Sequence, residues 1–202
     1  MTTRVHLDRH VWTEATLHAI AAEGLQGVVV ETLARTLGVT KGSFYWHFAN
    51  RAALLSAAVA RWETSETRML GPVAGTISDV GRRLLVLTQR AHCEPRLRLT
   101  RAFNAAVGHP LVGPAVARVA RSRVSFLAEC LAAMGMDKAE AMQDAQIAYA
   151  SYLGAAEMSA IGVGAQTRRE LRVLVQRTIA RLLPGTWEPG RAILGAAHGR
   201  RG

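Results

Sequence analysis

An unusual cluster of ring-bearing side chains lies within the segment GVTKGSFYWHFANRAALL, residues 38–55. Aromatic residues make up only 5% of the 202-residue chain, yet the run from Phe44 to Phe48 consists of rings alone, one of them the imidazole of His47. On a helix, five consecutive side chains point to every side of the axis. Some of these rings must therefore face solvent, or a partner that replaces solvent.

The residues around this run suit contacts with nucleic acid. Lys41 and Ser43 precede it, and short or cationic side chains in the first turn of a groove-reading helix reach base edges or phosphate. Gly42 between them lets the backbone approach a ligand closely. We expect Phe44 and Phe48 to anchor the helix to its neighbours. The outward rings, which can lie against phosphate and sugar, are Tyr45, Trp46 and His47.

The charge of the chain favours an anionic partner. Formal net charge is +10 at neutral pH, which points first to nucleic acid and second to an acidic lipid surface. Half of the residues are hydrophobic, so most of the chain can bury a core. No apolar run reaches the roughly 18 residues needed to span a bilayer, and MTTRVHLDRH lacks the apolar region of a signal peptide. We therefore expect a cytoplasmic protein.

Other chemistries find little support in the sequence. Cys93 and Cys130 lack metal-ligand spacing and are expected to be small buried thiols in a reducing compartment. His6 and His10 lie one helical turn apart and could hold a metal, but no third ligand is evident nearby. The motifs of hydrolases, P-loop proteins and zinc proteases are missing. We expect no cofactor, no metal and no enzymatic activity.

Turn signals predict an all-α chain. The first helix is expected from the N-cap Asp8 to Glu23, stopped by Gly24. A second one ends at Gly38, a third runs from Thr40 to Phe48, and a long one follows Asn50 over 51–69. Two short helices joined by a glycine turn make a helix-turn-helix. After breaks at 71–76 and 108–114, further helices are expected at 80–93, 97–107, 115–134, 138–162 and 167–183.

The stretch LARTLGVTKGSFYWHFANRAALL resembles the DNA-binding signature of TetR-type transcriptional repressors, with a helix, a glycine turn, Y-x-H-F and N-R-x-x-L-L at fixed spacing. The resemblance covers about residues 8–68 in its motifs and the remainder only in architecture. It implies a DNA-binding domain over 1–50, an effector-binding and dimerisation domain over 51–183 with a connecting helix at 51–69, and a tail at 184–202. Residues matching the family's DNA contacts are Thr40, Lys41, Gly42, Ser43, Tyr45, Trp46, His47 and Arg51.

The resemblance further implies a homodimeric repressor that a small-molecule effector releases from a palindromic operator. Residues on the helices that would surround the effector, where ordinary core packing is the alternative, are Trp62, Leu87, Arg90, Phe103, Phe126, Tyr149 and Tyr152. The last two long helices would form the dimer interface, with apolar residues Leu153, Ala156, Leu171, Val175 and Ile179.

One departure from the family pattern leaves an alternative open. The second helix usually begins with a hydroxyl cap and a basic residue, whereas this chain has Val29, Val30 and Glu31. Glu31 would repel phosphate unless it accepts a hydrogen bond from a cytosine amino group. A small-molecule-binding helical protein that has lost operator binding is therefore a second interpretation. A basic membrane-surface protein is a third, although no helix combines a basic face with a broad apolar one.

Overall fold

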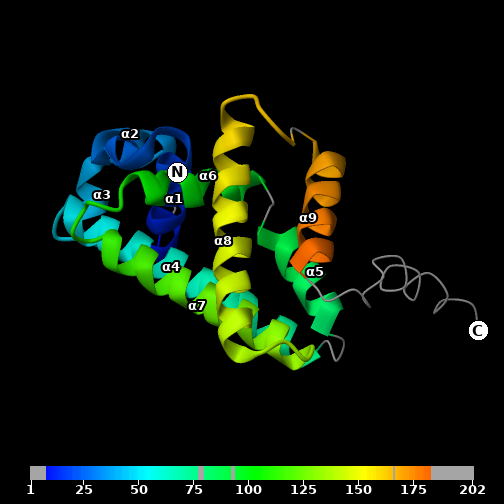
Figure 1. Ribbon diagram of the computed structural model, residues 1–202. Helices are drawn as coiled ribbons and strands as arrows, with labels where there is room; N and C mark the ends of the chain where they lie inside the picture. Colours follow the sequence, from blue (N-terminus) through cyan, green and yellow to red (C-terminus); the bar gives the residue numbers. More distant parts are fainter. Residues whose placement is uncertain (1–7, 77–79, 92–93, 166, 183–202) are drawn as a thin grey trace, which may run out of the picture. The chain divides into compact units, whose positions relative to one another are not determined.

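The computed structural model describes residues 8–76, 80–91, 94–165 and 167–182. Every regular element in these ranges is helical, which confirms the all-α expectation (Figure 1). The helices are α1 (Arg9–Glu23), the 3-10 turn η1 (Gly24–Gly27), α2 (Val30–Thr36), α3 (Lys41–Tyr45), α4 (Arg51–Thr76), α5 (Val80–Ala91), α6 (Glu94–Ala105), α7 (Gly113–Ala133), α8 (Lys138–Ala160) and α9 (Arg168–Leu182).

The expected caps set the ends of the first helices. The Asp8 carboxylate accepts a hydrogen bond from the Val11 amide at 3.0 Å, which satisfies one of the free amides at the start of α1. Gly24 ends this helix with a φ of +73°. The Asn50 side chain accepts from the Ala53 amide at 2.9 Å at the start of α4. Local sequence thus determines where α1 and α4 begin.

The chain forms two compact packing units. Among the described residues, unit 1 contains those up to Glu66 together with Pro95–Val119, and unit 2 contains those from Thr67 to Glu94 and from Ala120 on. The helices α4 and α7 each contribute residues to both units. The functional domain boundary expected at residue 50 rests on DNA-binding and effector-binding roles rather than on packing, so it stays a prediction.

Unit 1 gathers α1, α2 and α3 around the first part of α4 (Figure 1). The ring of Phe44 is fully buried and meets the Trp12 ring edge-on, with centroids 5.5 Å apart. Phe48 stacks on the other side of Phe44 at 5.7 Å. Burying large side chains of this kind stabilises a fold by about 1.5–3 kcal/mol each. The short helix α3 therefore owes its position to tertiary packing rather than to helix propensity.

Unit 2 has its own smaller core. Its buried residues come from α5, α7 and α8, and α9 contacts both α5 and α8 (Figure 1). The Asp137 side chain caps α8 by accepting from the Ala139 amide at 2.8 Å. The buried residues of this core are Leu84, Ala128, Cys130, Leu131, Ala141 and Ala145.

One of the two expected breaks is wrong, and the other is confirmed. Residues 71–76 continue α4 to Thr76 instead of interrupting the chain. Pro72 removes a single backbone donor, and a helix can pass such a residue while its other hydrogen bonds remain. The break at 108–114 separates α6 from α7. The helix expected to begin at residue 97 begins at Glu94, and Pro95 lies in its first turn, where its missing N–H would have no helical partner. The expected third helix is also shorter, ending at Tyr45 rather than Phe48.

In the part of the chain that the structure describes, no helix is both long enough and apolar enough to cross a bilayer.

Candidate DNA-binding surface

The helix-turn-helix presents its aromatic run as expected, with anchors inside and polar rings outside. The side chain of Trp46 is 87% exposed and that of Tyr45 is 58% exposed, whereas Phe44 and Phe48 are buried. Ser43 and His47 are half-buried. The spacing explains this division, because residues four apart share one helix face and the residues between them face elsewhere. Thr40, Lys41 and Gly42 complete the exposed set at the start of α3.

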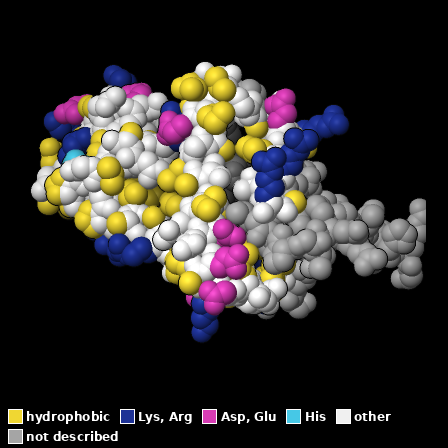
Figure 2. All heavy atoms as spheres, in the orientation of Figure 1, with side chains coloured by type: hydrophobic (Ala, Val, Ile, Leu, Met, Phe, Trp, Pro, Cys, Tyr) yellow, Lys and Arg dark blue, Asp and Glu magenta, His cyan; other side chains and the backbone are white. Residues whose placement is uncertain are grey.

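An ion pair links the two helices of the motif. The Glu31 carboxylate, in the first turn of α2, lies 2.5 Å from the ammonium Nζ of Lys41, the first residue of α3. The hydrogen bond from Lys41 lowers the pKa of Glu31, and the same bond raises the pKa of Lys41. Both groups are therefore charged at neutral pH. In Figure 2, Lys and Arg atoms lie beside Asp and Glu atoms at the end of unit 1 that carries α2 and α3.

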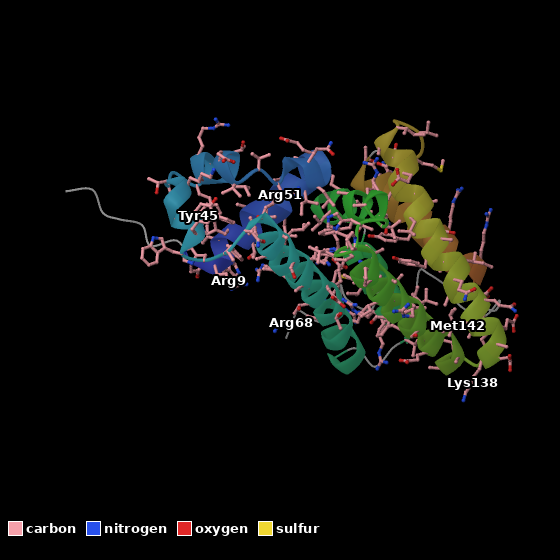
Figure 3. The ribbon with its side chains drawn as sticks, turned by 90° about the vertical axis from the view of Figure 1, so that its left-hand side faces the viewer. Arg9, Tyr45, Arg51, Arg68, Lys138 and Met142 are labelled. Atoms are coloured by element: carbon pink, nitrogen blue, oxygen red, sulfur yellow. The ribbon has the colours of Figure 1, made fainter. Side chains whose placement is uncertain are left out.

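Arg51 makes contacts that the sequence does not predict. Its Nε donates to the carbonyl oxygen of Val28 at 2.7 Å, and its Nη2 donates to that of Leu25 at 2.6 Å. These bonds tie the start of α4 to η1 and to Val28, the residue that follows it, and Figure 3 shows Arg51 at this junction. The Arg51 side chain thus helps to position the helix-turn-helix by binding main-chain carbonyl oxygens next to it. A contact between its exposed guanidinium and phosphate stays a prediction.

Further side chains on the same elements could reach a polyanion, although sequence reasoning missed them. Arg9, at the start of α1, places its guanidinium carbon 4.6 Å from the centroid of the Phe48 ring. In Figure 3 it lies in the same part of the unit as Tyr45. Thr32, Arg35 and Thr36 are exposed on α2. Their spacing of three and four residues, opposite buried Leu33, could have indicated an outward face of this helix.

Three ion pairs connect α4 to its neighbours inside unit 1. Arg61 pairs with Glu14 on α1, and the buried Glu66 carboxylate lies 2.5 Å from Nη1 of Arg96 on α6. Glu63 accepts two hydrogen bonds from Arg118 on α7, at 2.6 and 2.8 Å. The bond from Arg118 lowers the pKa of Glu63. Any rotation of α4 against α1, α6 or α7 would have to break such pairs.

The residues expected around an effector fall into both units. In unit 1 the buried rings of Trp62 and Phe103 pack against each other with centroids 4.5 Å apart. In unit 2 Tyr149 and Tyr152 stack at 6.0 Å. The remaining candidates belong to unit 2: Phe126 is half-buried, Arg90 is exposed, and the side chain of Leu87 lies outside those described. These data leave the effector site a prediction.

One arginine of the middle region, Arg123, lies in the interior of unit 2. Its side chain is buried in unit 2, with the guanidinium carbon 5.1 Å from the Tyr152 ring centroid and 6.0 Å from that of Tyr149. A guanidinium over aromatic faces is stabilised by the ring quadrupole. The sequence carries no signal for this contact, because the partners lie on different helices.

Apolar side chains stay exposed along α8. Hydrophobic atoms are visible along this helix in Figure 2. Of the expected interface residues, Ala156 is buried within unit 2 and Leu153 is half-buried, whereas the side chains of Leu171, Val175 and Ile179 lie outside those described. Exposed apolar side chains include Met142, Ile147 and Met158 on α8, Ile161 directly after it, and Val173 and Leu174 on α9.

No metal site is evident in the described residues. No three metal-ligating side chains gather within them, and His6 and Cys93 lie outside them. Cys130 is buried in the core of unit 2, as expected.

Known proteins resemble the chain in both sequence and fold. Residues 13–58 match the family described as "Bacterial regulatory proteins, tetR family". An uncharacterized HTH-type transcriptional regulator of Pseudomonas putida, TtgW, is 36% identical over 47 residues, which is 23% of this chain and 35% of that protein. The match thus spans about a third of the relative's length.

Solved structures extend the likeness beyond the motif. A transcriptional regulator from Rhodococcus shares the fold with a TM-score of 0.70 and 19% identity, covering 87% of this chain and 96% of that one. Escherichia coli NemR in its reduced form gives 0.69 and 22%, covering 84% and 94%. A TetR regulator from Legionella pneumophila gives 0.74 and 13%, covering 87% and 99%.

The exposed helix-turn-helix lies in the part of the chain, residues 13–58, that matches the family of tetR-type bacterial regulatory proteins. The chain as a whole shares the all-helical fold of solved regulators of that type.

Proposed function

We propose that the protein is a homodimeric transcriptional regulator that binds a palindromic DNA operator. It acts as a repressor that a small-molecule effector releases. The observation that carries this proposal is the outward face of α3, where Trp46 and Tyr45 remain exposed while Phe44 fastens the helix to unit 1. The Tyr45 ring contacts Phe44 on one edge, with centroids 5.1 Å apart, and the Trp46 ring is 87% exposed, so both can receive a partner from solvent. The same proposal implies a cytoplasmic location, where bacterial DNA lies.

On DNA, the N-terminal end of α3 enters the major groove. Lys41 and Ser43 then reach base edges or phosphate, and Gly42 permits close approach of the backbone. Tyr45, Trp46 and His47 lie against the sugar-phosphate backbone. Thr40 and Arg51 add backbone contacts at either end of the motif. Because these contacts neutralise phosphates, affinity falls steeply with salt.

A second copy of the chain supplies the second recognition helix. Two-fold symmetric partners read two half-sites about 34–36 Å apart, or a multiple of that distance. The exposed apolar side chains of α8 and α9 support a helical dimer face, because an isologous interface buries the same patch on both copies. Ile147 and Met158, three helical turns apart on α8, are its anchors.

The effector acts by a population shift. A ligand that binds one arrangement of α4 better than another changes the separation of the two recognition helices. The ion pairs that α4 makes with α1, α6 and α7 support this role, because they hold the helix in one register within unit 1. The candidates for effector contact are Trp62, Leu87, Arg90, Phe103, Phe126, Tyr149 and Tyr152.

Binding-site selection from genomic fragments tests the proposal, with the full chain at a stated salt concentration. The expected result is one palindromic sequence. Trp46→Ala should lose at least tenfold in affinity for it, since stacking and backbone contacts of one aromatic ring are worth about 1–3 kcal/mol. Val107→Ala is the matched control, because Val107 is also an exposed apolar residue of unit 1.

Selection of no sequence by a folded dimer would overturn the proposal. The chain would then fit a helical carrier of small molecules that has lost operator binding.

A further inference from the structure

The Glu31–Lys41 pair joins two positions of the DNA-binding surface that would otherwise act separately. Glu31 is the second residue of α2 and Lys41 is the first of α3, and their charged atoms lie 2.5 Å apart across the glycine turn. Each side chain is more than half exposed. The pair therefore stands on the outer side of the motif, beside Tyr45 and Trp46.

Solvent exposure makes this pair easy to exchange. Charges in water attract each other weakly, and exposed ion pairs contribute little to stability. The pair thus has no evident role in holding α2 against α3, which the buried Leu33, Ala34 and Phe44 already do. A phosphate of approaching DNA can replace the carboxylate as the partner of Lys41.

Once Lys41 binds a phosphate, the Glu31 carboxylate has lost its partner and faces the negatively charged DNA. A carboxylate can only accept hydrogen bonds, so guanine N7 and O6 and thymine O4, which are acceptors, repel it. Adenine offers an N6 amino donor but places the acceptor N7 beside it, whereas cytosine presents its N4 amino donor without a neighbouring acceptor in the major groove. A hydrogen bond from the cytosine amino group to Glu31 would replace the hydrogen bond that Glu31 loses when Lys41 turns to a phosphate.

We propose that Glu31 is a specificity-determining residue, which holds Lys41 in the free protein and accepts a hydrogen bond from a cytosine amino group in the operator complex. The lowered pKa of Glu31 agrees with this role, because a charged carboxylate is needed at neutral pH. The assignment rests on the proposed function, since it presupposes a DNA partner. Glu31 accordingly weakens binding to most sequences and spares those with cytosine at one position of each half-site.

Binding-site selection and affinity measurements with three single variants test this assignment at 0.15 M salt. Glu31→Gln should bind random DNA about fivefold more tightly, because it removes a negative charge that offsets about one phosphate contact at this salt. Because glutamine pairs with adenine N6 and N7, the preferred base at one position should change from cytosine to adenine, by about tenfold. Glu31→Ala should lose the preference there. Glu129→Gln, the same charge change at an exposed site of α7, should alter neither.

A double variant separates direct reading from an effect through lysine. If Glu31 contacts the base, Glu31→Gln changes the preferred base in a Lys41→Met background as it does in the native chain. If the change vanishes there, Glu31 acts only by neutralising Lys41 and the assignment is wrong. An equal gain on all sequences, with cytosine still preferred, also overturns it.

The outcomes also separate this assignment from the proposed function. Selection of no sequence by the native chain overturns both. A palindrome that the native chain and Glu31→Gln select alike overturns the role of Glu31 alone.

Discussion

Phe44 and Trp46 lie two positions apart and face in opposite directions, which is what about 100° of rotation per residue requires. One ring is fully buried and the other is 87% exposed. At the scale of single residues, position on the helix thus separates packing from recognition. Burial also decides how a cysteine side chain behaves, because a buried thiol is less reactive than an exposed one.

Cys130 should resist alkylation in the folded protein. Burial raises the pKa of its thiol to about 11 from an ordinary value of 9.0. At pH 8 the reactive thiolate then falls from about one thiol in ten to about one in a thousand. The reaction with iodoacetamide, followed by mass spectrometry of the peptide that contains Cys130, should be at least about 100-fold slower than in denatured protein. Equal rates in the two states would show that the thiol is accessible.

At the scale of elements, local sequence signals predict where a helix begins or ends better than they predict whether it continues through a glycine or a proline. Asp8, Gly24 and Asn50 mark helix ends correctly, because a cap needs only a few neighbouring residues. The passage of α4 through 71–76 was missed, since Gly and Pro are breakers only when the rest of the helix fails to hold. The Glu31–Lys41 pair was missed for another reason. Its members lie ten positions apart and meet only when the turn folds.

Two glycines of the helix-turn-helix should respond differently to the same substitution. Gly38 has a φ of +68°, which L-residues adopt at a cost of roughly 1–2 kcal/mol. Gly38→Ala should therefore destabilise the fold by about that amount in urea unfolding. Gly42 lies within α3, and a methyl group there meets only Thr40 Oγ1 at 3.6 Å.

Gly42→Ala should leave stability unchanged or slightly higher, because alanine favours helix by about 1 kcal/mol. Its DNA affinity should fall, since the proposed interface needs the backbone close to the groove. The two variants control for each other, because Gly38→Ala tests the conformation of the turn and Gly42→Ala tests the DNA-binding surface. Unchanged DNA affinity of Gly42→Ala would show that this backbone does not approach DNA.

At the scale of the whole molecule, the proposed dimer would connect the apolar face of α8 with the electrostatics of DNA binding. Ile147 and Met158 are 54% and 46% exposed in the single chain. Ala156, one of the residues expected at the interface, packs inside unit 2. Which side of such a helix faces out depends on α7 and α5, and hence on contacts distant in sequence.

Met158→Arg should convert the dimer into a monomer, because it buries an uncompensated charge at the proposed interface. Sedimentation velocity measures the mass, and Val107→Arg, at an exposed site of unit 1, controls for added charge. The plot of log affinity against log salt has a slope of about −0.9 for each phosphate neutralised. A monomer makes half the contacts, so the slope of Met158→Arg should be about half that of the native chain. A dimer that persists with an unchanged slope would place the interface elsewhere, whereas a monomer with the full slope would mean that one copy makes every phosphate contact.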